Sequence, residues 1–288
     1  MDIQKKIYYR LKAWTPPRLL PLVLKGAVLL RYLLLRDKAV LKKNTRLKES
    51  AVGRDAYLLA TGPSLKGIDL GFLEGKDCFS VSNFMLHPQL NEVCPKLHFF
   101  APYHEPLIFE EYVSWLRQAD AMLPASTGIV LGLQTKGTVE KYGLFRGREV
   151  HYLCLEKVSL TSVPDITRPV VAPQTSPIMV LPVLHYMGYK RVFLLGCDHN
   201  ILKNYGRVVE NFYSADQDPR KNATSGDNWR DGIIKHLENA LNVFAQYMYY
   251  KKVFSGSGRE LRHTSKEGWL DFLEYTSLDE LRLAKVKE

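Results

Sequence analysis

The sequence predicts an α/β protein with a doubly wound, mostly parallel sheet, preceded by an amphipathic helix and carrying a lid insertion. Two observations lead to this fold class. Short apolar runs without alternation, typical of strands buried on both faces, lie between stretches with helical spacing. The clearest of these runs stop at glycine and polar residues. Strands that alternate with helices in this way favour parallel pairing.

The first clear run is 56–60, which leads directly into Thr61, Gly62, Pro63 and Ser64. Glycine lets the backbone come close to a ligand, proline suits the first position of a helical turn, and serine caps such a turn or contacts a ligand. A strand that ends this way presents free N–H groups to an anion such as a phosphate. The same pattern also fits an ordinary loop between a strand and a helix, so both interpretations stay open.

The second clear signal begins at Thr175 and Ser176, which precede a proline in a typical helix start. The helix that follows is apolar nearly all round, so we expect it to be buried. The next strand, 191–196, ends at Gly196 and is followed by Asp198 and His199. Polar residues at the carboxyl end of a buried strand lie where open α/β sheets bind their ligands.

The remaining elements follow from shorter patterns. We expect a lid over residues 199–228, because a long polar segment directly after a candidate site is often functional. The catalytic domain is expected to span residues 51–260, with a C-terminal helix in 261–288. Further strands are predicted at 78–82, 97–100, 121–124, 129–133, 150–155 and 253–255, and further helices at 105–119, 229–250 and 267–287.

The net charge of +10 belongs to the first 50 residues, which contain thirteen Lys or Arg and three Asp or Glu. The other 238 residues contain 27 basic and 27 acidic side chains. A nucleic-acid-binding protein more often carries its basic surface on the folded domain, so we expect no nucleic-acid partner. The four cysteines show no metal-binding spacing, and we expect buried thiols and no metal site.

Residues 1–50 are predicted to form a basic, amphipathic, membrane-associating leader. Its segment 19–35 is strongly apolar but is interrupted by Lys25 and Arg31. A charge at the centre of a bilayer costs at least ~2.5 kcal/mol, which argues against a spanning helix. A helix lying in the interface fits better, with residues 1–45 on an anionic membrane surface and a polar linker over 42–54. A core helix packed on the domain is the alternative.

The ordered set of motifs resembles bacterial CMP-sialic-acid-dependent sialyltransferases that build lipooligosaccharide. It consists of Gly62-Pro63-Ser64-Leu65 after the first strand, Ser82-Asn83-Phe84, Thr175-Ser176, and the strand that ends in Gly196-x-Asp198. The same residues, over roughly 55–255, are also similar to the MptE-like domain, named for a hydroxymethylpterin diphosphokinase and found in motility accessory factors that resemble nonulosonate transferases. The resemblance implies a single Rossmann-like, GT-A-like nucleotide-binding domain.

The resemblance implies a set of donor contacts in this chain. They are Thr61, Gly62, Pro63, Ser64, Asn83, Thr175, Ser176 and Gly196. Three residues depart from the sialyltransferase pattern: Thr61 replaces an asparagine, Pro177 a glycine and Ala101 another asparagine. The histidine that the family places just before the long helix is missing from residues 224–228.

An inverting glycosyl transfer needs a base for the acceptor hydroxyl and a partner for the departing phosphate. We predict His199 as the base beside Asp198, with His104 and His263 as further alternatives. In the lid, Tyr205 and Tyr213 are predicted to donate hydrogen bonds to the phosphate. Packing roles for these histidine and tyrosine side chains stay open.

The expected function is therefore a membrane-associated glycosyltransferase that moves a nonulosonate- or sialic-acid-like sugar from a CMP donor to a glycan or lipid-linked acceptor of the bacterial surface, such as lipopolysaccharide or capsule. We expect it on the cytoplasmic side of the inner membrane, without a cofactor. One alternative is a pyrophosphokinase that uses ATP and Mg²⁺, in which Asp198 would hold the ion. Another is a non-catalytic nucleotide-binding scaffold at the membrane.

Overall fold

The computed structural model describes residues 19–104, 107–207, 209–220, 229 and 231–285 of the 288-residue chain. Its centre is an eight-stranded sheet in the order β10-β9-β8-β1-β2-β3-β4-β5, and every neighbouring pair is parallel. This confirms the predicted α/β, doubly wound class. The strands are β1 (Asp55–Leu59), β2 (Cys78–Val81), β3 (Leu97–Phe100), β4 (Gly128–Gly132), β5 (Val150–Leu153), β8 (Arg191–Leu195), β9 (Glu260–His263) and β10 (Glu274–Tyr275); β6 (Leu155–Glu156) and β7 (Val170–Val171) form a separate pair.

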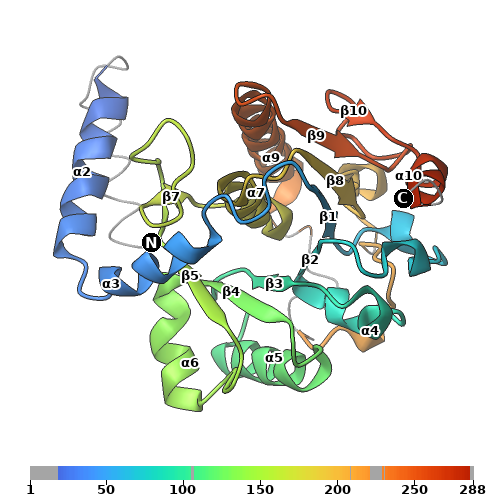
Figure 1. The fold of residues 1–288 in the computed structure, drawn as a ribbon, viewed down its shortest axis with the longest axis horizontal. Coiled ribbons are helices and arrows are strands. Elements are labelled where there is room, and N and C mark those ends of the chain that lie inside the picture. Colours follow the sequence, from blue (N-terminus) through green and yellow to red (C-terminus); the bar gives the residue numbers. More distant parts are fainter. Residues whose placement is uncertain (1–18, 105–106, 208, 221–228, 230, 286–288) are drawn as a thin grey trace.

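Helices cover both faces of this sheet (Figure 1). One face packs against α4 (Leu90–Val93), α5 (Phe109–Met122), α6 (Lys136–Tyr142) and α10 (Leu278–Lys285), and the other against α7 (Ser176–Met187) and α9 (Gly232–Ser255). The central strands are buried on both sides, which explains why their sequences are continuous apolar runs. As predicted, α7 is buried nearly all round, and it ends at Gly188 with a φ of 95° that favours glycine.

The chain changes direction in the middle of the sheet. From β1 it runs outward through β2, β3, β4 and β5, and then it returns to the other side of β1 with β8 and β9. The connections on the two sides of β1 therefore lead away from each other, and this creates a topological switch point between the carboxyl ends of β1 and β8. Open α/β sheets bind their ligands in this kind of crevice.

Three element predictions are wrong. Residues 121–124 are not a strand, because α5 continues to Met122. Residues 253–255 form the last turn of α9, where Tyr247, Tyr250 and Phe254 keep helical spacing on its buried face. The final long strand instead comes at β9, and the C-terminal helix is shorter than predicted, beginning at Leu278.

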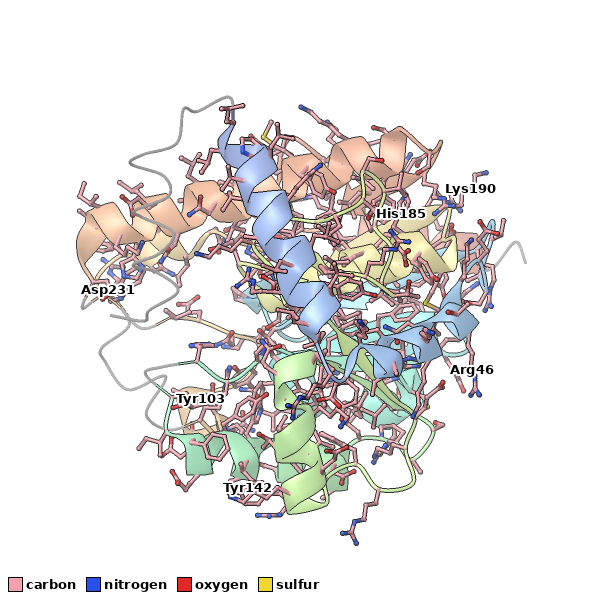
Figure 2. The ribbon with its side chains drawn as sticks, turned by 90° about the vertical axis from the view of Figure 1, so that its left-hand side faces the viewer. Arg46, Tyr103, Tyr142, His185, Lys190 and Asp231 are labelled. Atoms are coloured by element: carbon pink, nitrogen blue, oxygen red, sulfur yellow. The ribbon has the colours of Figure 1, made fainter. Side chains whose placement is uncertain are left out.

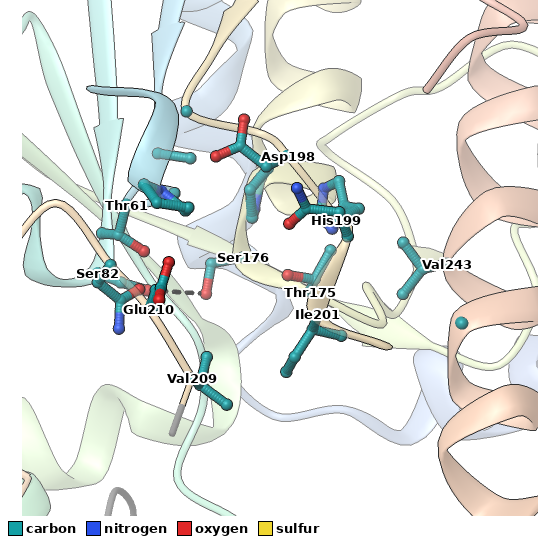
Figure 3. A pocket seen from close by; sticks show the side chains of 18 of the residues that line it. Thr61, Ser82, Thr175, Ser176, Asp198, His199, Ile201, Val209, Glu210 and Val243 are labelled. Atoms are coloured by element: carbon teal, nitrogen blue, oxygen red, sulfur yellow. Dashed lines mark hydrogen bonds between the residues drawn. The ribbon is translucent and has the colours of Figure 1, made fainter. Parts of the chain in front are cut away.

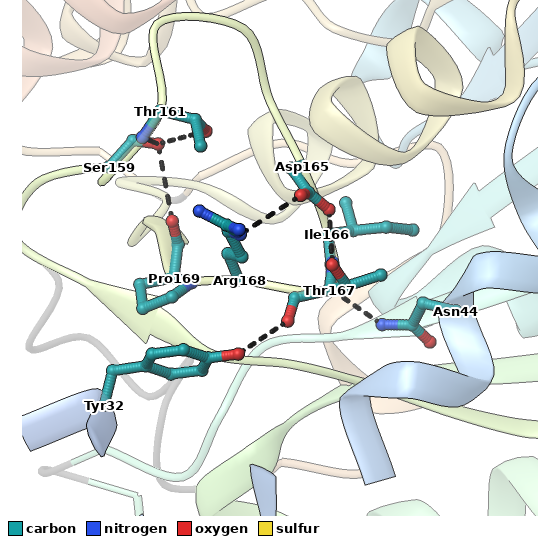
Figure 4. A network of polar contacts seen from close by, with 9 residues as sticks. All are labelled: Tyr32, Asn44, Ser159, Thr161, Asp165, Ile166, Thr167, Arg168 and Pro169. Atoms are coloured by element: carbon teal, nitrogen blue, oxygen red, sulfur yellow. Dashed lines mark hydrogen bonds and ion pairs between the residues drawn. The ribbon is translucent and has the colours of Figure 1, made fainter. Parts of the chain in front are cut away.

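The N-terminal helix α2 (Leu20–Leu34) has one face on the domain. Val28 is buried, and the hydroxyl of Tyr32 donates to the carbonyl of Thr167 at 3.1 Å (Figure 4). Arg31 forms an ion pair with Glu156. The opposite face is exposed, so the helix packs on the domain along one side only, and its association with a membrane stays a prediction. No helix in the described ranges is both long and apolar enough to span a membrane. Residues 1–18 of the predicted leader lie outside the described residues.

The predicted polar linker over 42–54 is wrong, because this segment completes the core. The short helix α3 (Lys38–Leu41) and the turn 42–47 lie against β5, and Leu41 and Asn44 are fully buried. The amide Nδ2 of Asn44 donates to the carbonyls of Tyr152 and Ile166, both at 2.8 Å. Asn44 Oδ1 lies 3.0 Å from His151 Nδ1.

Replacing Asn44 by alanine should therefore destabilise the protein. Asn44→Ala leaves two buried carbonyls and one ring nitrogen without this partner, and each unsatisfied group costs about 1–3 kcal/mol. We expect the free energy of unfolding in urea to fall by at least ~2 kcal/mol. The neighbouring Thr45→Ala, at an exposed position, is the matched control and should change it little. Equal stability of the two variants would contradict an integral role for this segment.

Candidate functional site

Three hydrogen bonds join the ends of β1 and β8. Two are between backbone groups, and the third is from a backbone amide to a carboxylate. The amide of Ala60 donates to the carbonyl of Leu195 at 2.9 Å, and that of Gly62 donates to the carbonyl of Gly196 at 2.8 Å. The amide of Ser64 then donates to Oδ2 of Asp198 at 2.9 Å. The turn after β1 and the segment after β8 are therefore a single unit, as the two sequence signals predicted.

Glycine is required at position 62 because of the space beside it. Its φ of −65° is open to any residue. A Cβ atom, however, would lie 2.3 Å from Oδ2 of Asp198 and 2.5 Å from the carbonyl oxygen of Gly196. The close approach that the sequence assigned to a ligand is thus made by the Asp198 carboxylate.

A cavity of about 410 Å³ opens at this junction, between the strand ends, the start of α7 and one face of α9 (Figure 3). Its size lies within the range of small-molecule sites. Eight of the twelve predicted site residues line it: Thr61, Gly62, Pro63, Thr175, Ser176, Gly196, Asp198 and His199. The structure therefore brings together residues from three separate parts of the sequence.

Asn83 and Tyr213 are two of the four predicted site residues that do not line the cavity, and they contact each other. Asn83 is fully buried, its Nδ2 donates to the hydroxyl of Tyr213 at 2.9 Å, and its Oδ1 accepts from Nε1 of Trp115 at 2.7 Å. Burial raises the pKa of Tyr213 to about 12, so its hydroxyl stays neutral. Its partner Asp218 is paired with Arg220. These side chains are engaged with one another and do not line the cavity at Asp198, although Tyr213 lines a neighbouring one.

Ser82, the residue before Asn83, takes the place at the cavity that was predicted for Asn83. Ser82 lines the cavity, and its hydroxyl donates to the hydroxyl of Ser176 at 2.9 Å. Its φ of 52° is unusual for a residue with a side chain, and such strain is often found at functional sites. Nε2 of His98 lies 3.0 Å from the Ser82 carbonyl oxygen, and burial holds the pKa of His98 at about 3. The neutral ring therefore acts as a fixed support for the strained turn.

Part of the predicted lid borders the cavity, whereas residues 208 and 221–228 lie outside the described residues. The amide of Phe212 donates to the carbonyl of Thr61 at 3.2 Å, and Glu210 lines both this cavity and a neighbouring one of about 570 Å³. The second cavity also contains Lys66 and Arg220. Of the charged groups among the described lining residues, the first cavity holds the carboxylates of Asp198 and Glu210 and no Lys or Arg.

His199 lines the cavity but is already hydrogen-bonded. Its Nε2 lies 2.8 Å from the hydroxyl of Tyr247, and burial lowers the pKa of the imidazole to about 4 although Asp198 acts to raise it. The ring is thus neutral at pH 7. When Tyr247 donates to Nε2, the ring proton is on Nδ1 and no ring lone pair is left to accept another proton. This geometry weakens His199 as a base.

His236 is the histidine that sequence reasoning missed. It lies in the second turn of α9, lines the cavity, and its Nε2 is buried without a hydrogen-bond partner. Its ring packs against Trp229 and Tyr205, with centroids 4.8 and 6.2 Å apart. The signal was present as His236, Asn239, Ala240 and Val243 on one helix face. The resemblance places the family histidine just before the helix, in 224–228, whereas His236 lies within it.

The remaining predicted candidates lie elsewhere. Tyr205 packs against the ring of His236 and does not line the cavity. His104 and His263 do not line it either. Nδ1 of His263 is 3.1 Å from the carbonyl oxygen of Ser265. Cys94 is exposed, contrary to expectation, whereas the other three cysteines are buried. No group of three His, Cys, Asp or Glu side chains suited to a metal ion occurs within the described ranges, and metal use is untested.

No family model matches the chain, and no curated protein matches it in sequence. Among solved structures, the chain is similar to the sialyltransferase CstII from Campylobacter jejuni, in complex with a substrate analogue, cytidine-5'-monophosphate. The two share 15% sequence identity with a TM-score of 0.44, over 80% of this chain and 87% of that one. A likeness at this level carries no argument about what this chain binds or catalyses.

Replacing Gly62 by alanine should break the junction. The Gly62→Ala methyl group overlaps a carboxylate and a carbonyl oxygen, so the turn has to move away from Asp198. We expect a loss of about 1–3 kcal/mol in the free energy of unfolding, as for other overpacked sites. Gly137→Ala, a position with no atom within 4 Å, is the control and should not lower stability. Unchanged stability of Gly62→Ala would contradict the geometry.

The buried histidines should make stability depend on pH. Burial lowers the pKa values of His98 to about 3 and of His185 and His199 to about 4, whereas unfolded histidines titrate near ~6.5. Between these values the unfolded chain binds more protons than the folded one, so stability falls as the pH drops from about 6.5 towards 4. Urea midpoints should show this decline, and His98→Gln should flatten it. Parallel pH profiles of the two proteins would contradict the assignment.

Proposed function

We propose that this protein is a membrane-associated glycosyltransferase that transfers a nonulosonate- or sialic-acid-like sugar from a CMP donor to a glycan or lipid-linked acceptor of the bacterial surface. The observation that carries the proposal is the cavity at the switch point between β1 and β8, lined by most of the predicted donor-binding residues. The resemblance of the same motifs to sialyltransferases supplies the choice of donor.

The start of α7 is the place for the donor phosphate. The hydroxyls of Thr175 and Ser176 line the cavity, and the N-terminus of this twelve-residue helix carries partial positive charge. This matters because the cavity holds no Lys or Arg among its described lining residues. The carboxylates of Asp198 and Glu210 suit the hydroxyl groups of a ribose or a sugar, to which they can accept hydrogen bonds.

His236 replaces His199 as the proposed general base. His236 lines the cavity and its Nε2 has no protein partner, so in this proposal Nε2 accepts the proton of an acceptor hydroxyl. The acceptor oxygen then bonds to the anomeric carbon from the side opposite the phosphate, the bond to the phosphate oxygen breaks, and CMP leaves with its negative charge near α7. Such a displacement inverts the anomeric centre. Tyr205 and Tyr213 have packing and hydrogen-bonding roles and are not needed for this step.

A pyrophosphokinase is the second candidate, because two carboxylates line the cavity. Oδ1 of Asp198 is buried and has no partner, and Mg²⁺ is often bound through one or two carboxylates together with substrate phosphates. In that case ATP would require Mg²⁺ for binding and AMP would be released. A nucleotide-binding scaffold without catalysis is the outcome if nucleotides bind but no donor is turned over.

Nucleotide preference and base identity are tested together. We expect CMP to raise the melting temperature more than UDP, GDP or ATP, with EDTA having no effect. His236→Ala should lower turnover of a CMP-sugar by about 10²–10⁴-fold, the usual contribution of a general base, and leave the CMP shift intact. His263→Ala, outside the cavity, is the control. A shift with ATP that needs Mg²⁺ would favour the pyrophosphokinase, and full activity of His236→Ala would reject this base.

A further inference from the structure

Helix α2 presents an uncovered leucine face. Leu24 and Val28 point towards the domain, whereas the outer face holds Leu19, Leu22, Leu29, Leu30 and Leu33, which are between 46% and 66% exposed. Lys25 and Arg31 lie on its flanks, and Arg31 is paired with Glu156. In water such a face costs free energy, since each leucine contributes about 1.5–3 kcal/mol when it is fully buried. Such an apolar face is a candidate docking surface.

Helix α9 carries a second exposed apolar ridge. Ile234, Leu237, Leu241 and Met248 follow one stripe of the helix and are between 49% and 69% exposed. The opposite side of the same helix borders the nucleotide-sized cavity through His236 and Val243. Figure 2 views the molecule with α2 in front and α9 running behind its N-terminal half.

A groove of about 510 Å³ lies between these two helices. Its lining is mixed: apolar and aromatic side chains come from Leu24, Val171, Ala172, Ala245, Tyr249 and Tyr250, and polar ones from Lys157, Gln174, Asn242 and Gln246. The groove and the cavity are separate spaces that lie close together along α9, because Val243 of the cavity and Gln246 of the groove are only about 4.5 Å apart along the helix axis.

One glutamine, Gln246, lies on the side of the groove that is nearest the cavity. Gln246 accepts from the amide of Gln174 at 2.8 Å and donates to the carbonyl of Ala172 at 2.9 Å. Gln174 lines the groove, and the next residue, Thr175, lines the cavity. A molecule lying in the groove would therefore end within a residue or two of the proposed transfer site.

The charge of the surroundings identifies what covers this surface. Lys25, Arg36, Lys42 and Lys43 are exposed and have no ion-pair partner among the described residues. Residues 1–50 together carry thirteen basic and three acidic side chains. An apolar face with unpaired cations on its helix and in the segment that follows matches an anionic lipid surface, in which the hydrocarbon covers the leucines and the headgroups meet the lysines.

We propose that α2 and the α9 ridge rest in an anionic lipid surface and that the groove between them seats the hydrocarbon chain of a lipid-linked acceptor. The role of this lipid as an acceptor rests on the proposed glycosyl transfer, whereas the binding of its hydrocarbon chain does not. The polar head of the acceptor reaches the cavity past Gln174, so the donor enters from the aqueous side and the acceptor from the membrane. This narrows the acceptor class to a lipid with a long alkyl or prenyl chain.

The test uses the full chain and phosphatidylglycerol vesicles that contain a long-chain prenyl phosphate with a photoactivatable group on its chain. Irradiation followed by mass spectrometry should place the label in residues 171–174 and 245–249. Ala245→Trp fills the groove and should reduce this labelling to background, while vesicle flotation and the CMP thermal shift stay unchanged. Label spread over the surface, or undiminished in Ala245→Trp, would overturn the groove assignment.

A second comparison of variants tests docking on the lipid surface. Replacing Leu30 and Leu33 by aspartate should weaken flotation with these vesicles by about tenfold or more, because two leucines that the lipid would cover are lost. Leu283→Asp changes an equally exposed leucine on α10, at the other end of the molecule, and should leave flotation unchanged (Figure 1). Equal flotation of both variants would overturn the docking surface. A missing CMP shift in the wild-type protein would instead count against the proposed function alone.

Discussion

The structure depends on the position of one carboxylate, that of Asp198 beneath Gly62. The Ser64 amide holds it, and the absence of a side chain at position 62 makes room for it. This contact fixes the carboxyl end of β8 against the turn after β1, at the one place in the sheet where the chain reverses its order. The cavity lies where the two strand ends are joined and the connections that follow them lead away from each other. Every functional proposal for this chain starts from that opening.

The polar groups around the cavity are of two kinds: those that support its walls and those that are available to a ligand. His98, Asn83 and Tyr213 have their polar atoms satisfied by neighbouring side chains or backbone, and they hold the strained Ser82 turn and the segment that borders the cavity. His236 and Oδ1 of Asp198 are buried without partners. Buried polar atoms are normally satisfied, so these two are the atoms at which a ligand has something to gain.

The sequence predicted the sheet, the two junction segments and the burial of α7, because those features depend on local apolar runs and on glycine or proline at their ends. It did not predict the roles of neighbouring residues such as Ser82 and Asn83, since one residue in a turn decides which side chain reaches the cavity. His236 was missed because the resemblance places the family histidine just before this helix, whereas His236 lies inside it and lines the cavity. The segment 42–47 looks polar, yet its single buried Asn44 satisfies carbonyls that only the folded chain brings together.

The most direct test is a crystal structure of the protein with CMP. The account predicts the phosphate at the start of α7, beside Thr175 and Ser176, and the ribose towards Asp198. A nucleotide bound away from the junction of β1 and β8, for example on the far face of the sheet, would contradict it.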